Sequence, residues 1–278
     1  MSLEVVAAGI EGVRLMLDWA AAEGWNPGLE DAEPFYATDP DGFLLARLDG
    51  VPVGSISVVR YPGDFAFLGF YIVRPEHRGR GFGMALWRTG MERLAGCNIG
   101  LDGVVAQQAN YRKSGFALAH RNVRFGGVPR AAPLDDPRVV PLERVPLPEL
   151  LAYDRSCFGF ERRPFLERWI ARPRIALGFL ERGRLLGYGV IRACRQGFKI
   201  GPLFADRADA AEALFLALAA QAGGQPVFLD PPEPNAEATA LARRHGLEPV
   251  FETARMYTRG DPGLPLSRIF GITTFELG

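Results

Sequence analysis

The chain has 278 residues, of which 48% are hydrophobic and 23% are charged, as in ordinary soluble globular proteins. This length suits two domains of about 130 to 140 residues each. The 32 basic and 32 acidic residues give a formal net charge of zero, which does not favour a nucleic-acid partner, because phosphates call for a basic surface.

Cysteine spacing and hydropathy indicate the cellular compartment in which we expect the protein. Cys97, Cys157 and Cys194 have a spacing that fits neither a zinc site nor a disulfide framework, so we expect free thiols in a reducing cytosol and no bound metal. The N-terminal residues lack the basic start and apolar core of a signal peptide, and no apolar run is long enough to span a membrane. We therefore expect a cytoplasmic protein.

The elements of the first half follow from hydrophobic periodicity and turn residues. The segments with helical spacing span residues 11–22, 82–94 and 109–114. The apolar runs bounded by turns, which predict strands, span residues 42–48, 51–59, 65–73, 98–105 and 117–125. Between the first helix and the first strand, Gly24, Pro27 and Gly28 break the pattern. This order predicts an α/β fold with a mixed, mainly antiparallel sheet flanked by helices.

A glycine cluster lies between the strand at 65–73 and the helix that follows it, at Gly79, Gly81 and Gly83. The first N–H groups of a helix have no intrahelical partner and lie at the positive end of its dipole, so this turn predicts an anion site. Arg78 and Arg80 add positive charge. A dinucleotide fingerprint would need a third glycine where Met84 stands, and no P-loop lysine follows.

Two motifs resemble those of a known family. The segment YIVRPEHRGRGFGMALW resembles the acyl-CoA loop of the GNAT superfamily (Gcn5-related N-acetyltransferases), whose signature is Gln/Arg-x-x-Gly-x-Gly/Ala. The later NYRKSGF resembles the N/L-Y-x-K-x-G-F ending of the same superfamily, in the expected order. The second half resembles the companion domain of a tandem-GNAT subgroup.

The resemblance implies roles for the donor side of a site. Acetyl-CoA would be the co-substrate. Its pyrophosphate would bind the loop formed by Arg78, Gly79, Arg80, Gly81, Phe82, Gly83 and Met84. The strand end at Tyr71, Ile72 and Val73 would bind the pantetheine arm, and one of its N–H groups would polarise the thioester carbonyl. Tyr111 would protonate the departing thiolate, since unperturbed phenol and thiol pKa values are about 10 and 8.5.

The sequence identifies the residues that would bind the acceptor amine less specifically than those that would bind the donor. Trp25, Glu30 and Asp31 lie where the superfamily builds its acceptor wall and would form an aromatic and acidic pocket for a cationic amine. Phe70, Asp102 and Gln107 complete the expected substrate contacts, Gln107 and Gln108 standing where an asparagine is common. The candidate bases are Glu30, Asp31, Asp102 and His77. The sequence leaves open that Trp25 caps the core, that Asp102 satisfies the turn at Gly103, and that Tyr111 is a core residue. It also leaves open that the glycine cluster is only a tight turn, and it favours an exposed structural role for His77.

An internal repeat divides the chain. Gly50 and Gly54 match Gly183 and Gly187 at an offset of 133, and Gly115 and Arg124 match Gly246 and Arg255 at an offset of 131. Six prolines between residues 126 and 150 predict a linker without a helix or central strand. We place the boundary near residue 135, which gives a catalytic domain over residues 1–135 and a degenerate GNAT-like domain over residues 136–278.

The second copy lacks the glycine cluster. An Asp209-x-x-Glu212 capping box is expected to open its corresponding helix, and Asp206 and Asp209 would occupy the helix N-terminus in place of a phosphate. We therefore interpret this copy as structural or substrate-binding. Five of its residues either close over the first copy's site or pack ordinarily within the second copy, namely Phe158, Phe160, Arg162, Arg163 and Trp169.

These observations predict an acetyl-CoA-dependent N-acetyltransferase that acts on a primary amine of a small molecule, such as an amino acid, polyamine or aminoglycoside-like compound, by direct attack in a ternary complex. We expect a monomer or homodimer with no nucleic-acid or membrane partner. A non-catalytic acyl-CoA sensor is the alternative. Transfer of an aminoacyl group from tRNA would want a basic groove, and a covering second domain would hinder a protein-lysine acceptor.

Overall fold

The first half of the chain forms the elements that its periodicity predicts, with two short additions. The computed structural model describes residues 2–130 and 135–278. The strands of this half are β1 (Leu3–Ala7), β2 (Phe43–Leu48), β3 (Val51–Tyr61), β4 (Phe65–Val73), β5 (Asn98–Val104) and β6 (Ala117–Gly127). Its α-helices are α1 (Ile10–Ala22), α2 (Ala32–Thr38), α3 (Phe82–Arg93) and α4 (Gln108–Lys113). The sequence analysis missed β1 and α2, which are short.

The second half repeats this plan. Its strands are β7 (Val139–Pro141), β8 (Ile175–Glu181), β9 (Arg184–Ala193), β10 (Phe198–Ala205), β11 (Val227–Leu229), β12 (Glu248–Tyr257) and β13 (Ile269–Gly271). Its α-helices are α5 (Leu147–Phe158), α6 (Arg163–Trp169), α7 (Ala208–Ala219) and α8 (Ala236–Arg244). The predicted repeat is confirmed at the hairpins β2–β3 and β8–β9, where Gly50 and Gly183 both take positive φ, at 83° and 75°.

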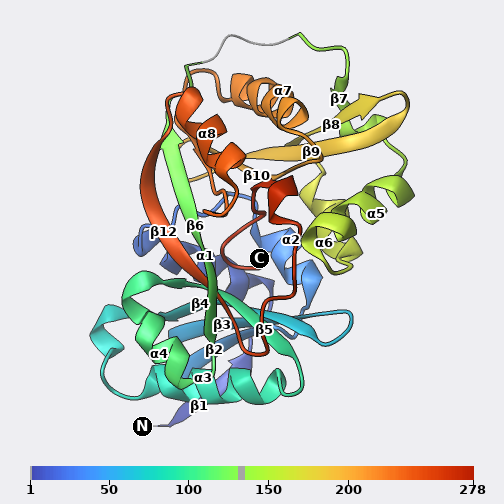
Figure 1. Cartoon of the computed structure of the whole chain (residues 1–278). Helices are drawn as coiled ribbons and strands as arrows, with labels where there is room; N and C mark the ends of the chain where they lie inside the picture. The colour runs from blue at the N-terminus through green and yellow to red at the C-terminus, as the bar shows by residue number, and fades with distance from the viewer. Residues whose placement is uncertain (1, 131–134) are drawn as a thin grey trace.

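The two halves share one continuous sheet because they exchange a strand (Figure 1). The strand order is β1-β2-β3-β4-β5-β12-β6-β11-β10-β9-β8-β7, so β12 of the second half pairs with β5 of the first, and β6 of the first half pairs with β11 of the second. The pairs β4–β5 and β10–β11 are parallel, and the other ladders of the described residues are antiparallel. The predicted mixed, mainly antiparallel α/β architecture is confirmed.

The repeated arginines Arg124 and Arg255 lie on the two exchanged strands, and each binds an aspartate of the other half. Arg124 on β6 forms a bidentate pair with Asp230, with both N···O distances 2.8 Å. Arg255 on β12 forms the equivalent pair with Asp102 on β5, at 2.9 and 2.6 Å. All four side chains are at most 5% exposed. Each exchanged strand therefore forms one buried ion pair with the other half of the chain.

Helix α3 packs on the first-half sheet through the stripe that the sequence predicts. Phe82, Leu86, Gly90 and Leu94 are all buried. A Cβ at Gly90 would lie 2.8 Å from Cγ1 of Val58 on β3, so the helix approaches the strand more closely than alanine allows. This packing fixes the N-terminus of α3, and with it the glycine loop, over the end of β4.

Two local predictions are wrong. The proline-rich segment holds the start of α5, because Pro148 lies in the first turn, where the missing N–H has no partner to lose. The segment also holds β7, but as an edge strand, which agrees with the prediction that no central strand forms there. The expected capping box of α7 does not form. Arg207 occupies the N-cap position without a side-chain hydrogen bond, and Asp209 pairs with Arg207 instead.

Three further expectations concern the chain as a whole. Cys97, Cys157 and Cys194 are free, buried thiols, as expected. Within residues 2–130 and 135–278, no helix is long and apolar enough to cross a membrane. The boundary placed near residue 135 follows directly after residues 131–134, which lie outside the described residues, and it stays a prediction.

Candidate active site

Strands β4 and β5 diverge and open a cleft in the first-half sheet. Their parallel ladder joins residues 65–68 to residues 98–101 and ends there. Immediately beyond, Phe70 takes φ of 45°, a left-handed conformation that is rare for a bulky residue, and the register with β3 shifts between Ser55 and Ser57. The Ser55 hydroxyl donates to the Phe70 carbonyl at 2.8 Å and stabilises this bulge. Strain concentrated at one strand end is typical of a functional site.

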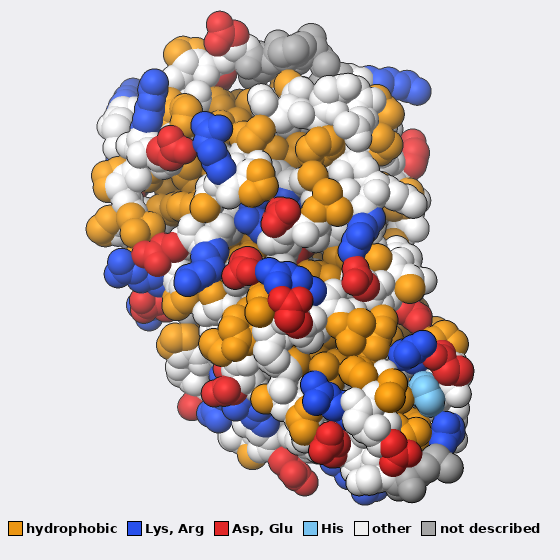
Figure 2. All heavy atoms as spheres, turned by 180° about the vertical axis from the view of Figure 1, so that it is seen from behind, with side chains coloured by type: hydrophobic (Ala, Val, Ile, Leu, Met, Phe, Trp, Pro, Cys, Tyr) orange, Lys and Arg blue, Asp and Glu red, His pale blue; other side chains and the backbone are white. Residues whose placement is uncertain are grey.

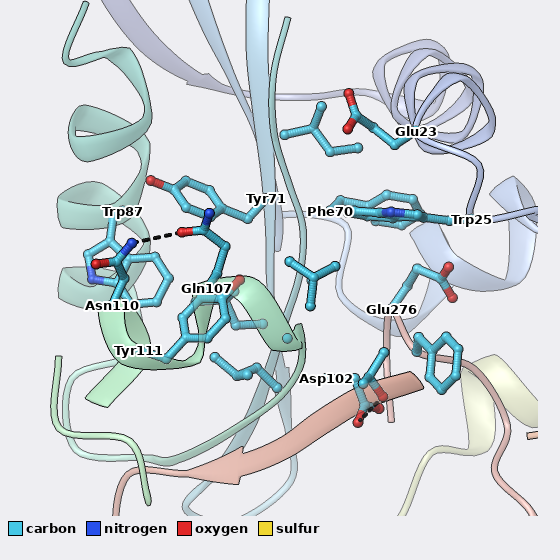
Figure 3. Close-up of a pocket in the computed structure, with 18 of the residues that line it drawn as sticks. Glu23, Trp25, Phe70, Tyr71, Trp87, Asp102, Gln107, Asn110, Tyr111 and Glu276 are labelled. Atoms are coloured by element: carbon cyan, nitrogen blue, oxygen red, sulfur yellow. Dashed lines mark hydrogen bonds between the residues drawn. The ribbon is translucent and has the colours of Figure 1, made fainter. Parts of the chain in front are cut away.

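Both halves line the resulting cleft, which has a volume of about 620 Å³. Trp25, Phe70, Tyr71, Ile72, Val73, Asp102, Gln107 and Tyr111 come from the predicted site. The second half adds Phe251 and Thr253 from β12 and Phe275 and Glu276 from the C-terminal segment. Figure 3 shows Tyr111 on one side of the cleft and Trp25 and Glu276 on the other. The site is thus composite, but its second-half residues are not the ones that the sequence analysis proposed.

The glycine loop forms a second, shallower hollow that continues into the cleft. Gly79 and Gly81 take positive φ, at 75° and 85°, and Gly81 is the N-cap residue of α3. A Cβ at Gly83 would lie 2.8 Å from the Tyr71 hydroxyl, so only glycine leaves the hollow open there. The hollow is lined by Tyr71, Val73, His77, Arg78, Gly79, Gly81, Phe82, Gly83, Met84 and Gln107. Backbone N–H groups and positive helix dipole suit a phosphate group here.

The arginines of this loop are engaged within the protein. Arg78 donates from Nε to the Val73 carbonyl at 2.8 Å and forms an ion pair with Glu23, the C-cap residue of α1. Arg80 lies over the ring of Phe82, with 4.9 Å from Cζ to the ring centroid. Arg78 therefore ties the loop to the end of β4 and to α1, and Glu23 is a cleft residue that the sequence analysis missed.

Tyr111 presents its hydroxyl to the cleft (Figure 3). Its ring packs against Trp87, with centroids 5.9 Å apart, and only 9% of the residue is exposed. Burial, reinforced by nearby Tyr71, raises the pKa of Tyr111 to about 12. The pKa of Tyr111 is thus farther from that of an unperturbed thiol than the pKa of a free phenol is. The same burial would also raise the pKa of a thiol held beside Tyr111.

Gln107 lies beside Tyr111 at the junction between the loop hollow and the cleft. It lines both, and its Oε1 accepts a hydrogen bond from Nδ2 of Asn110 at 2.7 Å (Figure 3). The pair presents a fixed amide group to the cleft, as an arm with amide groups would require.

Two predicted base residues lie outside the cleft. Asp31 is 1% exposed, and its carboxylate is 3.1 Å from Nε of Arg192 and accepts the N–H of Gly28 at 2.9 Å. Glu30 is exposed and does not line the cleft, and its backbone carbonyl accepts from Arg174. The prediction that these carboxylates act on the acceptor is wrong, because the segment turns both away from the cleft.

Asp102 and His77 are also occupied elsewhere. The Asp102 carboxylate is fully buried and accepts from Arg255 at 2.6 Å and from Nδ2 of Asn122 at 2.8 Å. It lines the cleft but serves the strand exchange, so it is no candidate base. His77 lies in the loop hollow, with Nδ1 3.2 Å from Nη1 of Arg80.

One side chain from each half holds the acceptor wall at residues 24–31, Arg124 of β6 and Lys199 of β10. Arg124 donates to the Trp25 carbonyl and Lys199 to the Asn26 carbonyl, each at 2.9 Å. Arg124 also lies over the ring of Phe275, with Cζ 4.6 Å from the centroid. The same guanidinium that pairs with Asp230 therefore fixes two aromatic residues of the cleft.

The second-half residues that were candidates to close the site make contacts in the core or at the surface instead. Phe158 and Phe160 pack on Tyr61 and Phe65 in the core. Arg162 is buried against Asp154, Trp169 stacks on Phe35, and Arg163 pairs with Glu167 at the surface. The structure therefore supports ordinary packing for these residues, and none of them lines the cleft. No motif in the sequence marked the residues that replace them, because Phe275 and Glu276 lie beyond the repeat.

Comparison with known proteins gives a consistent picture. Residues 11–116 match the acetyltransferase (GNAT) family, and residues 150–271 match an acetyltransferase (GNAT) domain. A holothin acyltransferase of Pseudoalteromonas sp. (strain SANK 73390) is 30% identical over 273 residues, covering 98% of this chain and 93% of the relative. A solved structure from Pyrococcus horikoshii, provisionally assigned as an acetyltransferase, is 25% identical with a TM-score of 0.83 and covers 99% and 96% of the two chains. A tandem GNAT protein of the clavulanic acid biosynthesis pathway, 17% identical with a TM-score of 0.66, covers 94% and 99% and shares the fold.

Proposed function

The chain belongs to the GNAT family of acetyltransferases, with one GNAT domain in each half, and from this premise we propose that it is an N-acetyltransferase. It transfers an acetyl group from acetyl-CoA to a primary amine of a small molecule by direct attack. The observation that carries the proposal is the continuity of the site. A glycine loop suited to a pyrophosphate opens into a cleft that holds Tyr111 and continues to an aromatic compartment between the halves.

The residues present fit the donor. Gly81 and Gly83 leave backbone room for a phosphate at the start of α3, and the free edge of β4 beyond residue 68 can bind an extended arm with amide groups. Bound acetyl-CoA supplies an activated thioester. Tyr111 holds its proton at every physiological pH, because its pKa is about 12, and donates it to the leaving sulfur.

Direct attack is supported by the positions of the thiols. Of the residues that line the cleft in the described part of the chain, none is a cysteine. Burial raises the pKa of Cys157 to about 12 and raises that of Cys194, so neither is poised as a thiolate. The acceptor amine itself is therefore the nucleophile. The relative named above is a holothin acyltransferase, which supports acyl transfer as the activity of this chain.

Two alternatives are less well supported. A non-catalytic acyl-CoA sensor needs the loop but neither the Tyr111 hydroxyl nor an acceptor compartment. A tRNA substrate needs a basic surface, whereas the face in Figure 2 carries acidic and basic side chains interspersed.

The test is release of free CoA thiol when acetyl-CoA is mixed with a panel of primary amines. We expect Tyr111→Phe to lower kcat by about 100- to 10,000-fold, because it removes the general acid. Its affinity for acetyl-CoA should stay unchanged. The matched control is Tyr36→Phe on α2, outside the cleft, which should retain full activity. Tight binding of acetyl-CoA without turnover of any amine would favour the sensor instead.

A further inference from the structure

The end of the cleft farthest from the glycine loop is an aromatic compartment. The hollow at the loop and the cleft share Tyr71, Val73, Arg78, Met84 and Gln107, which places these residues at the donor end. Trp25, Phe70 and Glu276 lie across the cleft from Tyr111 (Figure 3). Phe251 and Phe275 line the cleft but not the hollow, their ring centroids are 6.0 Å apart, and Arg124 contacts both Phe275 and the Trp25 carbonyl. Four aromatic rings around one carboxylate form a narrow, largely apolar space, which suits a flat molecule.

Glu276 is the carboxylate of this compartment, and no hydrogen bond or ion pair from a described residue reaches it. The residue is 4% exposed, and burial raises its pKa. The charged groups that face it are Lys199, Asp31, Arg124 and Arg192, from β10, the N-cap of α2, β6 and β9. Each of these is committed elsewhere. Lys199 binds the Asn26 carbonyl, Arg124 binds Asp230, and Arg192 pairs with Asp31.

A buried carboxylate without a partner costs folding free energy, so its place at the end of a cleft points to a ligand. The Gly69 backbone fixes this place, because a Cβ there would lie 2.3 Å from the Glu276 carbonyl oxygen. Glu276 also lies across the cleft from Tyr111 (Figure 3), so its carboxylate meets a part of the acceptor remote from the reacting amine.

The other charges of the cleft limit what the acceptor can carry. Glu23 is paired with Arg78 at the donor end, and Asp102 is saturated by Arg255. A polycationic acceptor would thus find a single free carboxylate, that of Glu276, among the described residues that line the cleft. A carboxylate on the acceptor would find no free cation at the aromatic end, since Lys199 and the arginines there are paired.

We propose that Glu276 is the specificity-determining residue of this cleft, and that the acceptor is an amine carried on a flat, apolar ring system with one N–H group that donates to Glu276. The inference rests on the proposed acetyl transfer and narrows its acceptor class. It excludes polyamines and aminoglycosides as preferred acceptors.

Tryptamine and 1-methyltryptamine are the probes, since both are primary amines on an indole ring and only the first has a ring N–H. For the wild type we expect a lower KM for tryptamine. Glu276→Gln should raise that KM by about 10- to 100-fold, the loss of one charge-assisted hydrogen bond. It should leave kcat and the KM for acetyl-CoA unchanged, and it should distinguish the two probes less than the wild type does, because its amide oxygen accepts the ring N–H only as a neutral group. Glu237→Gln on the exposed start of α8 is the control and should behave as wild type.

Two readouts separate recognition from a structural role. The wild-type KM for tryptamine should rise as the pH falls and Glu276 takes up a proton, and this dependence should vanish in Glu276→Gln. The melting temperature of Glu276→Gln should equal or exceed that of the wild type, because the amide removes an uncompensated buried charge. A lower melting temperature with an unchanged KM would overturn the inference.

The outcomes with other amines separate the two proposals. Preference of the wild type for spermidine or kanamycin over tryptamine would overturn the inference and leave acetyl transfer standing. Absence of turnover with all four amines would overturn both.

Discussion

Gly103 on β5 determines where the Tyr111 ring can lie. A Cβ at this position would lie 2.2 Å from Cε2 of Tyr111, and the ring has no room to retreat because Trp87 packs on it. We predict that Gly103→Ala displaces the ring and lowers kcat nearly as far as Tyr111→Phe does, while acetyl-CoA still binds. Steady-state kinetics and calorimetry together measure this. The control is Gly9→Ala, where the added methyl meets nothing within 4 Å. Full activity of Gly103→Ala would show that the hydroxyl position is not critical.

The local surroundings of single residues explain which parts of the site could be predicted from the sequence. The donor residues were predictable because they form one contiguous motif, residues 78–84, and a single later tyrosine. The base prediction failed because Asp31 and Asp102 look available in sequence, whereas each is buried against an arginine of the other half, Arg192 or Arg255. Glu276 belongs to no motif, and only tertiary structure brings it to the cleft.

At the scale of elements, the strand exchange depends on buried ion pairs. We predict that Arg124→Met lowers the free energy of unfolding by about 3–5 kcal/mol at neutral pH, because Asp230 is left buried and charged. Arg121→Met is the control on the same strand. Its partner Glu252 is 44% exposed, and such surface pairs contribute below about 1 kcal/mol. Denaturant unfolding of both variants measures the difference, and equal losses would contradict a role for the pair.

The loss of unfolding free energy in Arg124→Met depends on pH in a direction that follows from the pKa of Asp230. Although burial alone would raise it, the pKa of Asp230 is lowered overall, chiefly by Arg124. In the wild type the pair therefore stabilises the fold above the unfolded aspartate pKa of about 3.9, and that stabilisation is lost as the pH falls through the folded value. In Arg124→Met the lone carboxyl can be protonated as the pH falls. The deficit should thus be largest near pH 7 and shrink toward about pH 4.

The exchange itself could not be predicted from the sequence. Strands β6 and β12 are the two copies of one repeat element, with Arg124 and Arg255 in matching places. Either strand has the pattern needed to pair with β5, so local propensity and periodicity do not distinguish the two arrangements. The helices and most strands were predictable, because their periodicity is local, whereas the pairing partner is a property of the whole fold.

At the scale of the molecule, the second half contributes side chains to the site rather than a second donor site. It supplies β12 to the first-half sheet (Figure 1), anchors residues 24–31 through Lys199, and contributes Phe275 and Glu276 to the cleft. The second half lacks a glycine cluster of its own, which agrees with a role in contributing side chains to the site of the first half. One half is suited to hold the donor, and the junction of the halves is suited to select the acceptor.

The most direct test of this account is calorimetric titration of acetyl-CoA into the wild type and into Gly81→Glu. A glutamate at the N-cap of α3 introduces negative charge where a pyrophosphate would bind, at a position whose φ of 85° favours glycine. Circular dichroism of the variant verifies that it is folded. We predict one binding site per chain in the wild type and none in the folded variant. Absence of binding to the wild type, or unchanged binding to Gly81→Glu, would contradict the assignment of the donor site to this loop.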